Sequence, residues 1–331
     1  MSDDSAVARL QDIGIGYWKS QALYVAAKLG IADHLRERPK TADELAAEVG
    51  AHSPSLFRVL RFLASLGVFD TGPDGAFSLN SLAEPLLTTS QGSTRDWVIM
   101  LGEEFYLAWG MLLDTVKDGK DSFRHTFGQG LFEYLARHPE YAKTFDRAMA
   151  AGSTFFDAVP SAYDFSPHRT VADVGGGNGA MLAAILTANT ALRGVLFDAP
   201  SVLESARANL EAQGVLERCE LVAGDFFESI VGGGDVYIFS RVLHDWTDEQ
   251  CVTILENCRR SISPDGRVLI IERLIPGSYA IASDINMLAV TGGRERSREE
   301  FASLLQEAGF ELLAVTPLPL EAHIVEAAPK R

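Results

Sequence analysis

Cysteine is scarce in this sequence. Three of the 331 residues are cysteines (Cys219, Cys251 and Cys258), an odd number with no C-x-x-C pair. The seven histidines are scattered, and no two of them lie four residues apart. We therefore expect neither a disulfide framework nor a zinc site, and reduced thiols as in a cytosolic protein.

Positive charge and long apolar runs are also lacking. The 29 Lys and Arg are outnumbered by 45 Asp and Glu, which gives a net charge of −16. This balance disfavours nucleic acid and anionic membranes as partners, because both require basic surface. No apolar run approaches the roughly 18 residues of a membrane span, and residues 1–5 are polar and acidic, unlike a signal peptide. We expect a cytoplasmic protein of about two domains.

A glycine-dense turn follows the first strongly apolar strand. Residues 171–174 read as a strand, the run Gly-Gly-Gly-Asn-Gly follows at 175–179, and a helix is expected from Ala180. Glycine adopts positive φ and lets a ligand lie against the main chain. At the end of a parallel strand, such a turn indicates a nucleotide-type cofactor site; a glycine turn without a ligand is the alternative.

The spacing within this turn distinguishes between cofactors. A dinucleotide fold has G-x-G-x-x-G, whereas the last of Gly175, Gly177 and Gly179 comes one residue early. Asp173, just before the turn, would repel a pyrophosphate and suits a cofactor with a cationic amino-acid end. The order Asp-x-Gly-x-Gly-x-Gly resembles motif I of S-adenosylmethionine-dependent methyltransferases.

Polar residues also follow the later apolar strands. Asp198 ends the strand at 194–198, 19 residues after Gly179, where an acid accepts hydrogen bonds from ribose hydroxyls. Three further strands each lead to a polar residue: 219–223 to Asp225, 235–240 to His244, and 267–272 to Glu272. Apolar strands that alternate with helical stretches predict an α/β fold, a Rossmann-like parallel sheet with its ligands at the carboxyl edge.

The N-terminal third has a winged-helix pattern. A helical stretch at 12–35 precedes a helix opened by a Thr41–Glu44 capping box. A third helix is expected over 55–66, and short apolar runs around the turn 71–75 predict a hairpin.

This pattern is typical of DNA-binding regulators, which are the rival interpretation. Residues 1–100 carry nine Lys and Arg against twelve Asp and Glu, and the helix that would enter the groove offers only Arg58 and Arg61. A groove reader needs basic side chains on that face. We therefore favour a dimerisation module over residues 1–100, followed by a catalytic domain over 101–331.

The stretch at 101–165 is helical and rich in aromatic residues. Such residues usually form core, but together with Met149 they also suit an apolar pocket for a flat substrate. We assign 101–165 as a substrate-pocket segment and 166–331 as the cofactor-binding core.

Four motifs in this order carry a family resemblance: Asp-Val-Gly-Gly-Gly-Asn-Gly, Phe-Asp-Ala-Pro, Gly-Asp-Phe-Phe and Leu-His-Asp-Trp-Thr-Asp-Glu-Gln-Cys. The chain resembles, over essentially its whole length, the small-molecule O-methyltransferases typified by plant caffeate and chalcone enzymes. It is most similar to their bacterial relatives in antibiotic and pigment biosynthesis. The resemblance implies a winged-helix domain that makes a homodimer.

The resemblance also implies the catalytic residues. The family's base corresponds to His244, and the acids that orient it correspond to Glu272 and Glu295. A loop acid paired with a neighbouring arginine is the alternative for Glu295. Asp245 either contacts the substrate or holds the turn before a helix that Thr247 caps.

Cofactor contacts carry over in the same way. S-adenosylmethionine is expected at a set of residues on the loops after the strands, with S-adenosylhomocysteine as product: Ser153, Asp173, Gly175, Gly177, Asp198, Asp225 and Phe226. Ser240 stands where plant enzymes have lysine, and Arg241 follows it, so a cationic contact is weakened or moved.

Substrate-facing positions by match are Phe145, Met149 and Met287. The loop at 274–289 is shorter than in plant enzymes, so plant substrates are not assumed. We expect O-methylation of an aromatic hydroxyl on a phenazine, a polyketide or a hydroxylated aromatic acid, without a metal. The alternatives are a same-fold hydroxylase or decarboxylase, an NAD-dependent oxidoreductase and a DNA-binding regulator; methylation of nitrogen also stays open.

Overall fold

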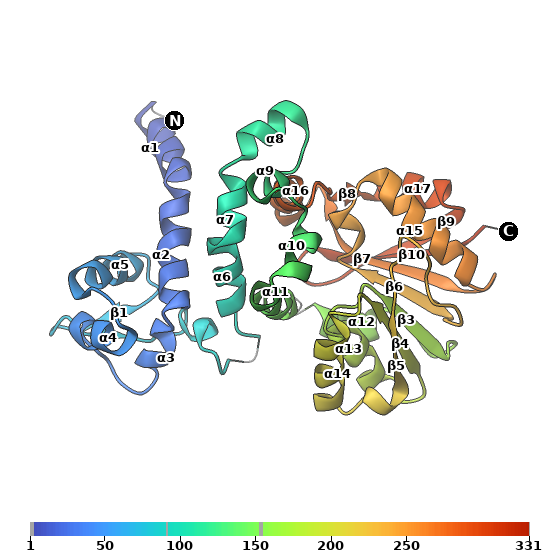
Figure 1. The fold of residues 1–331 in the computed structure, drawn as a ribbon, viewed down its shortest axis with the longest axis horizontal. Helices are drawn as coiled ribbons and strands as arrows, with labels where there is room; N and C mark the ends of the chain where they lie inside the picture. Colours follow the sequence, from blue (N-terminus) through green and yellow to red (C-terminus); the bar gives the residue numbers. More distant parts are fainter. Residues whose placement is uncertain (1–2, 91, 152–154, 331) are drawn as a thin grey trace. The chain divides into compact units, whose positions relative to one another are not determined.

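The computed structural model describes residues 3–90, 92–151 and 155–330 (Figure 1). The chain divides into two compact units, Met1–Tyr106 with His138–Gly152, and Leu107–Arg137 with Ser153–Arg331. The aromatic-rich stretch at 101–165 therefore contributes to both units. The domain boundaries at residues 100 and 165 stay predictions.

The first unit is mostly helical. In chain order its elements are α1 (Asp3–Gly14), α2 (Gly16–Lys28), α3 (Ile31–Leu35), α4 (Ala42–Val49), α5 (Ser53–Ser65), β1 (Asp70–Thr71), β2 (Phe77–Ser78), η1 (Glu84–Leu86), α6 (Arg95–Gly102) and α11 (Pro139–Ala151), and the division between units falls within α7 (Glu104–Trp109). Strands β1 and β2 pair antiparallel, so helices and wing match the predicted order.

Two details of this unit differ from the prediction. The helical stretch predicted over 12–35 is confirmed, but it consists of the end of α1 with α2 and α3, and Gly30 before α3 lies in the left-handed region (φ 65°). The wing strands are only two residues each. The Thr41–Glu44 capping box is confirmed, since each side chain bonds the other residue's backbone N–H.

The second unit contains a mixed sheet in the order β5-β4-β3-β6-β7-β10-β9, with β8 beside β7. Its strands are β3 (Thr170–Val174), β4 (Arg193–Asp198), β5 (Cys219–Ala223), β6 (Val236–Ser240), β7 (Arg267–Ile275), β8 (Arg296–Ser297), β9 (Phe310–Pro317) and β10 (Ala322–Pro329). Strands β3 to β7 are parallel, so their carboxyl ends share one edge, as predicted.

Helices cover both faces of this sheet (Figure 1). Helices α13 (Ala180–Ala188) and α14 (Leu203–Ala212) share one apolar core with alternate strand residues, and α15 (Asp248–Ser261) and α17 (Arg298–Glu307) share the other. The remaining elements are α8 (Leu112–Asp118), α9 (Ser122–Phe127), α10 (Leu131–Arg137), η2 (Phe156–Ala158), α12 (Val159–Ala162), η3 (Leu216–Arg218), η4 (Leu243–Asp245) and α16 (Ser278–Val290). Burial on both faces explains the continuous apolar runs of β3, β6 and β7.

The antiparallel strands β9 and β10 extend the sheet beyond the predicted parallel part. Their pairing places His323 of β10 opposite Glu272 of β7. Across the described ranges, 3–90, 92–151 and 155–330, no helix has both the length and the apolar character needed to cross a membrane.

Candidate active site

His244 lies in the short turn between β6 and α15. Strand β6 is buried along nearly its whole length, and η4 begins three residues after it ends. Thr247 then caps α15 through a capping box with Gln250, as predicted. Fixed at both ends, the turn leaves His244 only 8% exposed at the carboxyl edge of the sheet.

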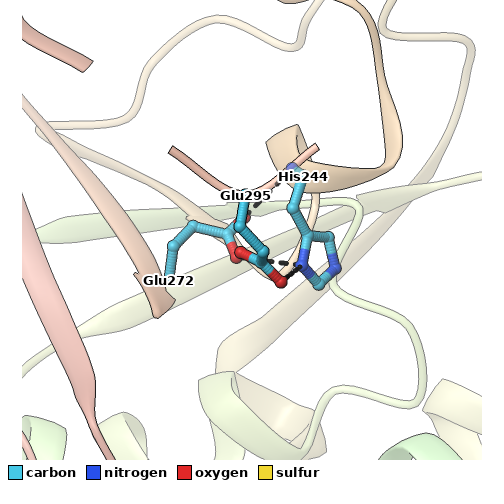
Figure 2. A group of neighbouring side chains, drawn as sticks. All are labelled: His244, Glu272 and Glu295. Atoms are coloured by element: carbon cyan, nitrogen blue, oxygen red, sulfur yellow. Dashed lines mark hydrogen bonds and ion pairs between the residues drawn. The ribbon is translucent and has the colours of Figure 1, made fainter. Parts of the chain in front are cut away.

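Two carboxylates face the same nitrogen of His244 (Figure 2). Nδ1 lies 3.0 Å from Oε1 of Glu295 and 3.4 Å from Oε2 of Glu272. Glu272 also accepts a 3.4 Å hydrogen bond from the backbone N–H of His244. The structure thus brings together the three residues predicted from distant parts of the chain. His244 lies four residues after β6, and Glu295 lies just before β8. Glu272 lies within β7, which continues to Ile275 beyond the end predicted at 272.

This arrangement selects one tautomer of the imidazole. A carboxylate beside Nδ1 holds a proton there, which leaves the lone pair of the neutral ring on Nε2. Among described ionic groups, Nε2 has the carboxylate of Asp245 at 3.9 Å, beyond hydrogen-bond length. Nε2 is therefore the nitrogen that is able to accept a proton from a ligand.

The charges around His244 oppose the effect of its burial. Burial alone would lower the pKa of His244, but Glu272, Asp245 and Glu295 outweigh it and raise this pKa to about 10. Burial raises the pKa of Glu272 to about 7, against the attraction of the imidazolium. For Glu295 burial acts upward, but the imidazolium and the hydrogen bonds from His244 and Ser283 lower its pKa overall.

Glu295 is itself held in place. Its Oε1 accepts a 2.7 Å hydrogen bond from Ser283 on α16, and its backbone N–H donates to Asp284. Both neighbouring arginines, Arg294 and Arg296, pair with Asp248. This geometry favours the orienting role expected of Glu295 over the alternative of a loop ion pair.

The same three side chains also offer a set of metal ligands. One ligand atom each of His244, Glu272 and Glu295 lies within 4.8 Å of the others, and all three residues are buried. The short contact between Nδ1 and Glu295 is equally explained by a hydrogen bond. Independence from metal stays a prediction, tested below with a chelator.

Asp245 lies on the opposite side of the imidazole from Glu295. Burial raises the pKa of Asp245 to about 6, opposed by the charges of His244 and Arg241. Its backbone N–H bonds Val242 within the turn. Both predicted roles of Asp245, substrate contact and support of the turn, are compatible with this position.

The glycine turn after β3 is open on the side predicted for the cofactor. Gly175 and Gly177 adopt positive φ (69° and 56°), and a Cβ at Gly177 would meet no atom within 4 Å. The N–H of Gly177 donates a 2.8 Å hydrogen bond to Oδ2 of Asp198. This bond joins the two loops between which a nucleoside is expected to lie.

Two buried side chains beside this turn, Asp173 and Ser240, have polar atoms without a hydrogen-bond partner among the described residues. These atoms are the two carboxylate oxygens of Asp173 and Oγ of Ser240. Burial and the charge of Asp198 raise the pKa of Asp173 to about 7. Buried polar groups are normally satisfied, so these atoms fit a polar ligand such as the amino-acid end of S-adenosylmethionine.

The loop after β5 presents an aromatic ring to the same place. The ring of Phe226 would lie 3.7 Å from a Cβ at Gly175 and meets Trp246 edge-on at 5.9 Å. Asp225 is exposed and accepts a bond from the N–H of Phe227. The buried amide of Asn257 on α15 donates to the carbonyls of Phe226 and Phe227, a support that sequence reasoning missed.

The remaining predicted residues are less directly placed. Arg241 has φ 56°, outside the usual range for a non-glycine residue; burial and Arg273 lower its pKa, opposed by Glu272. Met287 is buried on α16 of the second unit. Phe145 and Met149 lie half-buried on α11 of the first unit, and Ser153 lies outside the described residues.

Comparison with known proteins matches this architecture. Residues 12–89 match the O-methyltransferase dimerisation domain, and residues 109–311 match the O-methyltransferase domain. A phenazine O-methyltransferase of Lysobacter antibioticus is 44% identical, over 95% of this chain and 94% of that protein. The 3-amino-4-hydroxybenzoate 4-O-methyltransferase of Streptomyces cremeus is 42% identical, over 99% and 92%.

Solved structures agree with the fold and the cofactor. The chain superimposes on LaPhzM with a TM-score of 0.95 at 43% identity, over 98% of this chain and 99% of that one. It also superimposes on the O-methyltransferase NcsB1, solved with S-adenosylmethionine and 2-hydroxy-5-methyl naphthoic acid, with a TM-score of 0.85 at 32% identity, over 94% and 95%. The chain belongs to the S-adenosylmethionine-dependent O-methyltransferase family.

Proposed function

We propose that this enzyme methylates a hydroxyl group of a small aromatic natural product, with His244 as general base. The observation that carries the proposal is the imidazole with Nδ1 held by Glu295 and Nε2 left to accept a proton. Bound S-adenosylmethionine supplies an electrophilic methyl group on a sulfonium. The residues of the chain supply the base, its orientation and the cofactor's binding loops.

Proton transfer is the step that His244 serves. A neutral hydroxyl is a weak nucleophile, and a phenol has a pKa of about 10. The pKa of His244 is raised to about 10, so transfer from a phenol to Nε2 is close to balanced in free energy. The negative charges of Glu272 and Glu295 stabilise the imidazolium that forms, as an acid does in a catalytic triad.

Positioning supplies the rest of the rate. The cofactor loops and the His244 turn are joined through Trp246, whose ring packs against Phe226 on one side and stacks on Phe132 of α10 at 5.2 Å on the other. Holding oxygen, methyl carbon and sulfur in line removes much of the entropic cost of reaction.

The acceptor class is proposed from the relatives. Those named above act on a phenazine and on an aminohydroxybenzoate, both flat aromatic compounds with a hydroxyl. We therefore propose hydroxyphenazines and hydroxylated aromatic acids as the first acceptors to test. Polyketide phenols come next, because 2-hydroxy-5-methyl naphthoic acid is bound by NcsB1.

Methylation of nitrogen is the second candidate. The phenazine-1-carboxylate N-methyltransferase of Pseudomonas aeruginosa is 34% identical over 99% of this chain. A ring nitrogen without a proton needs no base, so an N-methyltransferase would not depend on His244. The site favours oxygen as the methyl acceptor, because two buried carboxylates lie beside Nδ1 of one imidazole and thus support a base.

We also propose that the enzyme is a homodimer through its N-terminal unit. Residues 12–89 match a dimerisation domain, and α1 and α2 expose a series of large apolar side chains: Val7, Leu10, Ile13, Tyr17 and Trp18. Exposed apolar patches of this kind mark protein interfaces.

The test of the function is a pooled assay. The pure protein is incubated with S-adenosylmethionine and a pool of hydroxyphenazines, hydroxybenzoates and amines, with and without EDTA. We expect S-adenosylhomocysteine and one or more O-methylated products by mass spectrometry, unchanged by EDTA. A hydroxylated or decarboxylated product without methyl transfer would contradict the proposal, and loss of activity with EDTA would assign the His244–Glu272–Glu295 cluster to a metal.

A further inference from the structure

Arg296 is a fully buried arginine beside the catalytic turn. It is 1% exposed, and its guanidinium donates in several directions. Nη1 bonds the carbonyl of Leu243 at 2.9 Å, Nη2 bonds the carbonyl of Trp246 at 2.9 Å, and Nε bonds Oδ1 of Asp248 at 2.9 Å. A further bond from Nη1 reaches the carbonyl of Arg294 at 3.2 Å.

Two of these acceptors bracket the base. Leu243 immediately precedes His244, and Trp246 follows one residue after Asp245. The planar guanidinium therefore fixes the main chain on both sides of the imidazole. A lysine cannot repeat this pattern, because its ammonium is a single point on a flexible stem and lacks the rigid fork of donors.

The chain on the other side of Arg296 holds the imidazole itself. Glu295, its direct neighbour, accepts the hydrogen bond at Nδ1. Gly293 packs so closely that an added Cβ would lie 2.1 Å from the carbonyl oxygen of His244. The segment 293–296 thus contacts His244 through side chain and backbone at once.

A contribution to folding stability alone does not explain why an arginine is buried at this position. A buried ion pair carries a large desolvation cost, and apolar replacements of similar size are often as stable. The partner of Arg296, Asp248, is half-exposed at 51%, so screening weakens the pair. The bond to the carbonyl of Leu243 is buried, and the bonds to the carbonyls of Trp246 and Arg294 are part-buried.

We propose that Arg296 is a positioning residue for methyl transfer: it clamps the backbone on either side of His244 so that Nδ1 stays on Glu295 and Nε2 stays in one place. The proposal rests on the proposed role of His244. It assigns to Arg296 an effect on the geometry and the pKa of the base, in addition to any effect on folding.

The test compares Arg296→Lys with Arg294→Gln, a matched control whose half-exposed side chain also pairs with Asp248. We expect Arg296→Lys to fold and to bind S-adenosylhomocysteine normally, with kcat about 10- to 100-fold lower, since small misplacements of a catalytic group cost this much. In the profile of kcat against pH, the rising limb of Arg296→Lys should lie at lower pH than that of the wild type, because His244 is less tightly paired with Glu295. The control should stay within about twofold of the wild type.

A second readout does not depend on activity. Titration of ¹⁵N-labelled histidines by NMR, with His244 assigned from His244→Gln, should show a lower pKa for His244 in Arg296→Lys. In a Glu295→Gln background, Arg296→Lys should add little further shift, since both act on one pair. If His244→Ala keeps its activity, the base assignment fails, while the NMR result still decides whether Arg296 holds His244 in its pairing with Glu295.

The proposal would be overturned if folded Arg296→Lys showed an unchanged pKa of His244 and if its kcat stayed at the wild-type value or fell only in proportion to the folded fraction. If Arg296→Lys does not fold, Asp248→Asn takes its place, because it loosens the same guanidinium from a half-exposed position. Asp248→Asn should lower the pKa of His244 in the same direction and to a smaller extent, and no shift in that variant would also overturn it.

Discussion

At the scale of single residues, the site depends on a competition between desolvation and charge. Burial favours the neutral imidazole, whereas the surrounding carboxylates favour the imidazolium and raise the pKa of His244. A raised pKa keeps His244 protonated, and therefore unable to act as a base, up to higher pH. Activity on an ordinary phenol should therefore rise with pH through and above neutrality, where an unperturbed histidine would already be deprotonated.

The contribution of Glu295 to this balance is testable. Glu295→Gln removes one negative charge from Nδ1, so the pKa of His244 should fall and the acidic limb of kcat/KM should move to lower pH. The maximum rate should fall about 10- to 100-fold, because the imidazolium is less stabilised. The pH profile with a phenol of pKa near 10 measures both effects; an acidic limb that stays in place would contradict the assigned coupling.

We propose that Asp198 contacts the cofactor. It accepts the N–H of Gly177 and ends β4 at the ligand edge of the sheet. Asp198→Asn should weaken binding of S-adenosylhomocysteine by about 10- to 100-fold, the usual loss for a hydrogen bond to a charged group. Isothermal titration calorimetry measures this, and an unchanged dissociation constant would remove Asp198 from the cofactor site.

At the scale of elements, the parallel strands were predictable because each one carries its own signal. Continuous apolar runs lead to Asp198, His244 or Glu272, and parallel strands bring residues near their carboxyl ends to one edge. The sequence could not place Ser283 or Asn257, because each acts through a contact with a distant segment. Strands β9 and β10 were missed for a related reason, since their pairing is antiparallel and falls outside the strand–helix alternation.

The close packing of the loop before β8 gives a prediction for Gly293. Its φ lies outside the left-handed region, so alanine is acceptable to the backbone, but a Cβ would overlap main-chain atoms of His244 and Asp245 at 2.1 and 2.4 Å. Gly293→Ala should therefore lower stability by about 1–3 kcal/mol and reduce kcat. Gly232→Ala, with no atom within 4 Å, is the control.

Thermal unfolding and steady-state kinetics of the two glycine variants decide the matter. If Gly293→Ala matched Gly232→Ala in both, the segment 293–296 would not be pressed against the catalytic turn as described.

At the scale of the whole molecule, the chain joins a helical unit with exposed apolar side chains to a catalytic sheet. The strongly acidic balance of −16 disfavours a second function on nucleic acid, although the winged-helix pattern is present. The apolar side chains on α1 instead match an interface between copies of the chain.

Light scattering after gel filtration tests that interface. The wild type should have the mass of a dimer, and the pair Leu10→Asp with Ile13→Asp should shift it toward the monomer, because two charges would be buried in the contact. Ala8→Asp with Gln11→Asp, on another face of α1, is the control. A monomeric wild type at micromolar concentration would refute the proposed homodimer.

In the proposed mechanism, His244 takes the proton of an aromatic hydroxyl during methyl transfer. The most direct measurement compares the wild type and His244→Ala under saturating S-adenosylmethionine with the acceptor found in the pool, following S-adenosylhomocysteine and methylated product together. We expect a fall in kcat of about 100-fold or more, with S-adenosylhomocysteine binding retained. Full activity in His244→Ala would show that positioning alone, or methylation of nitrogen, carries the reaction.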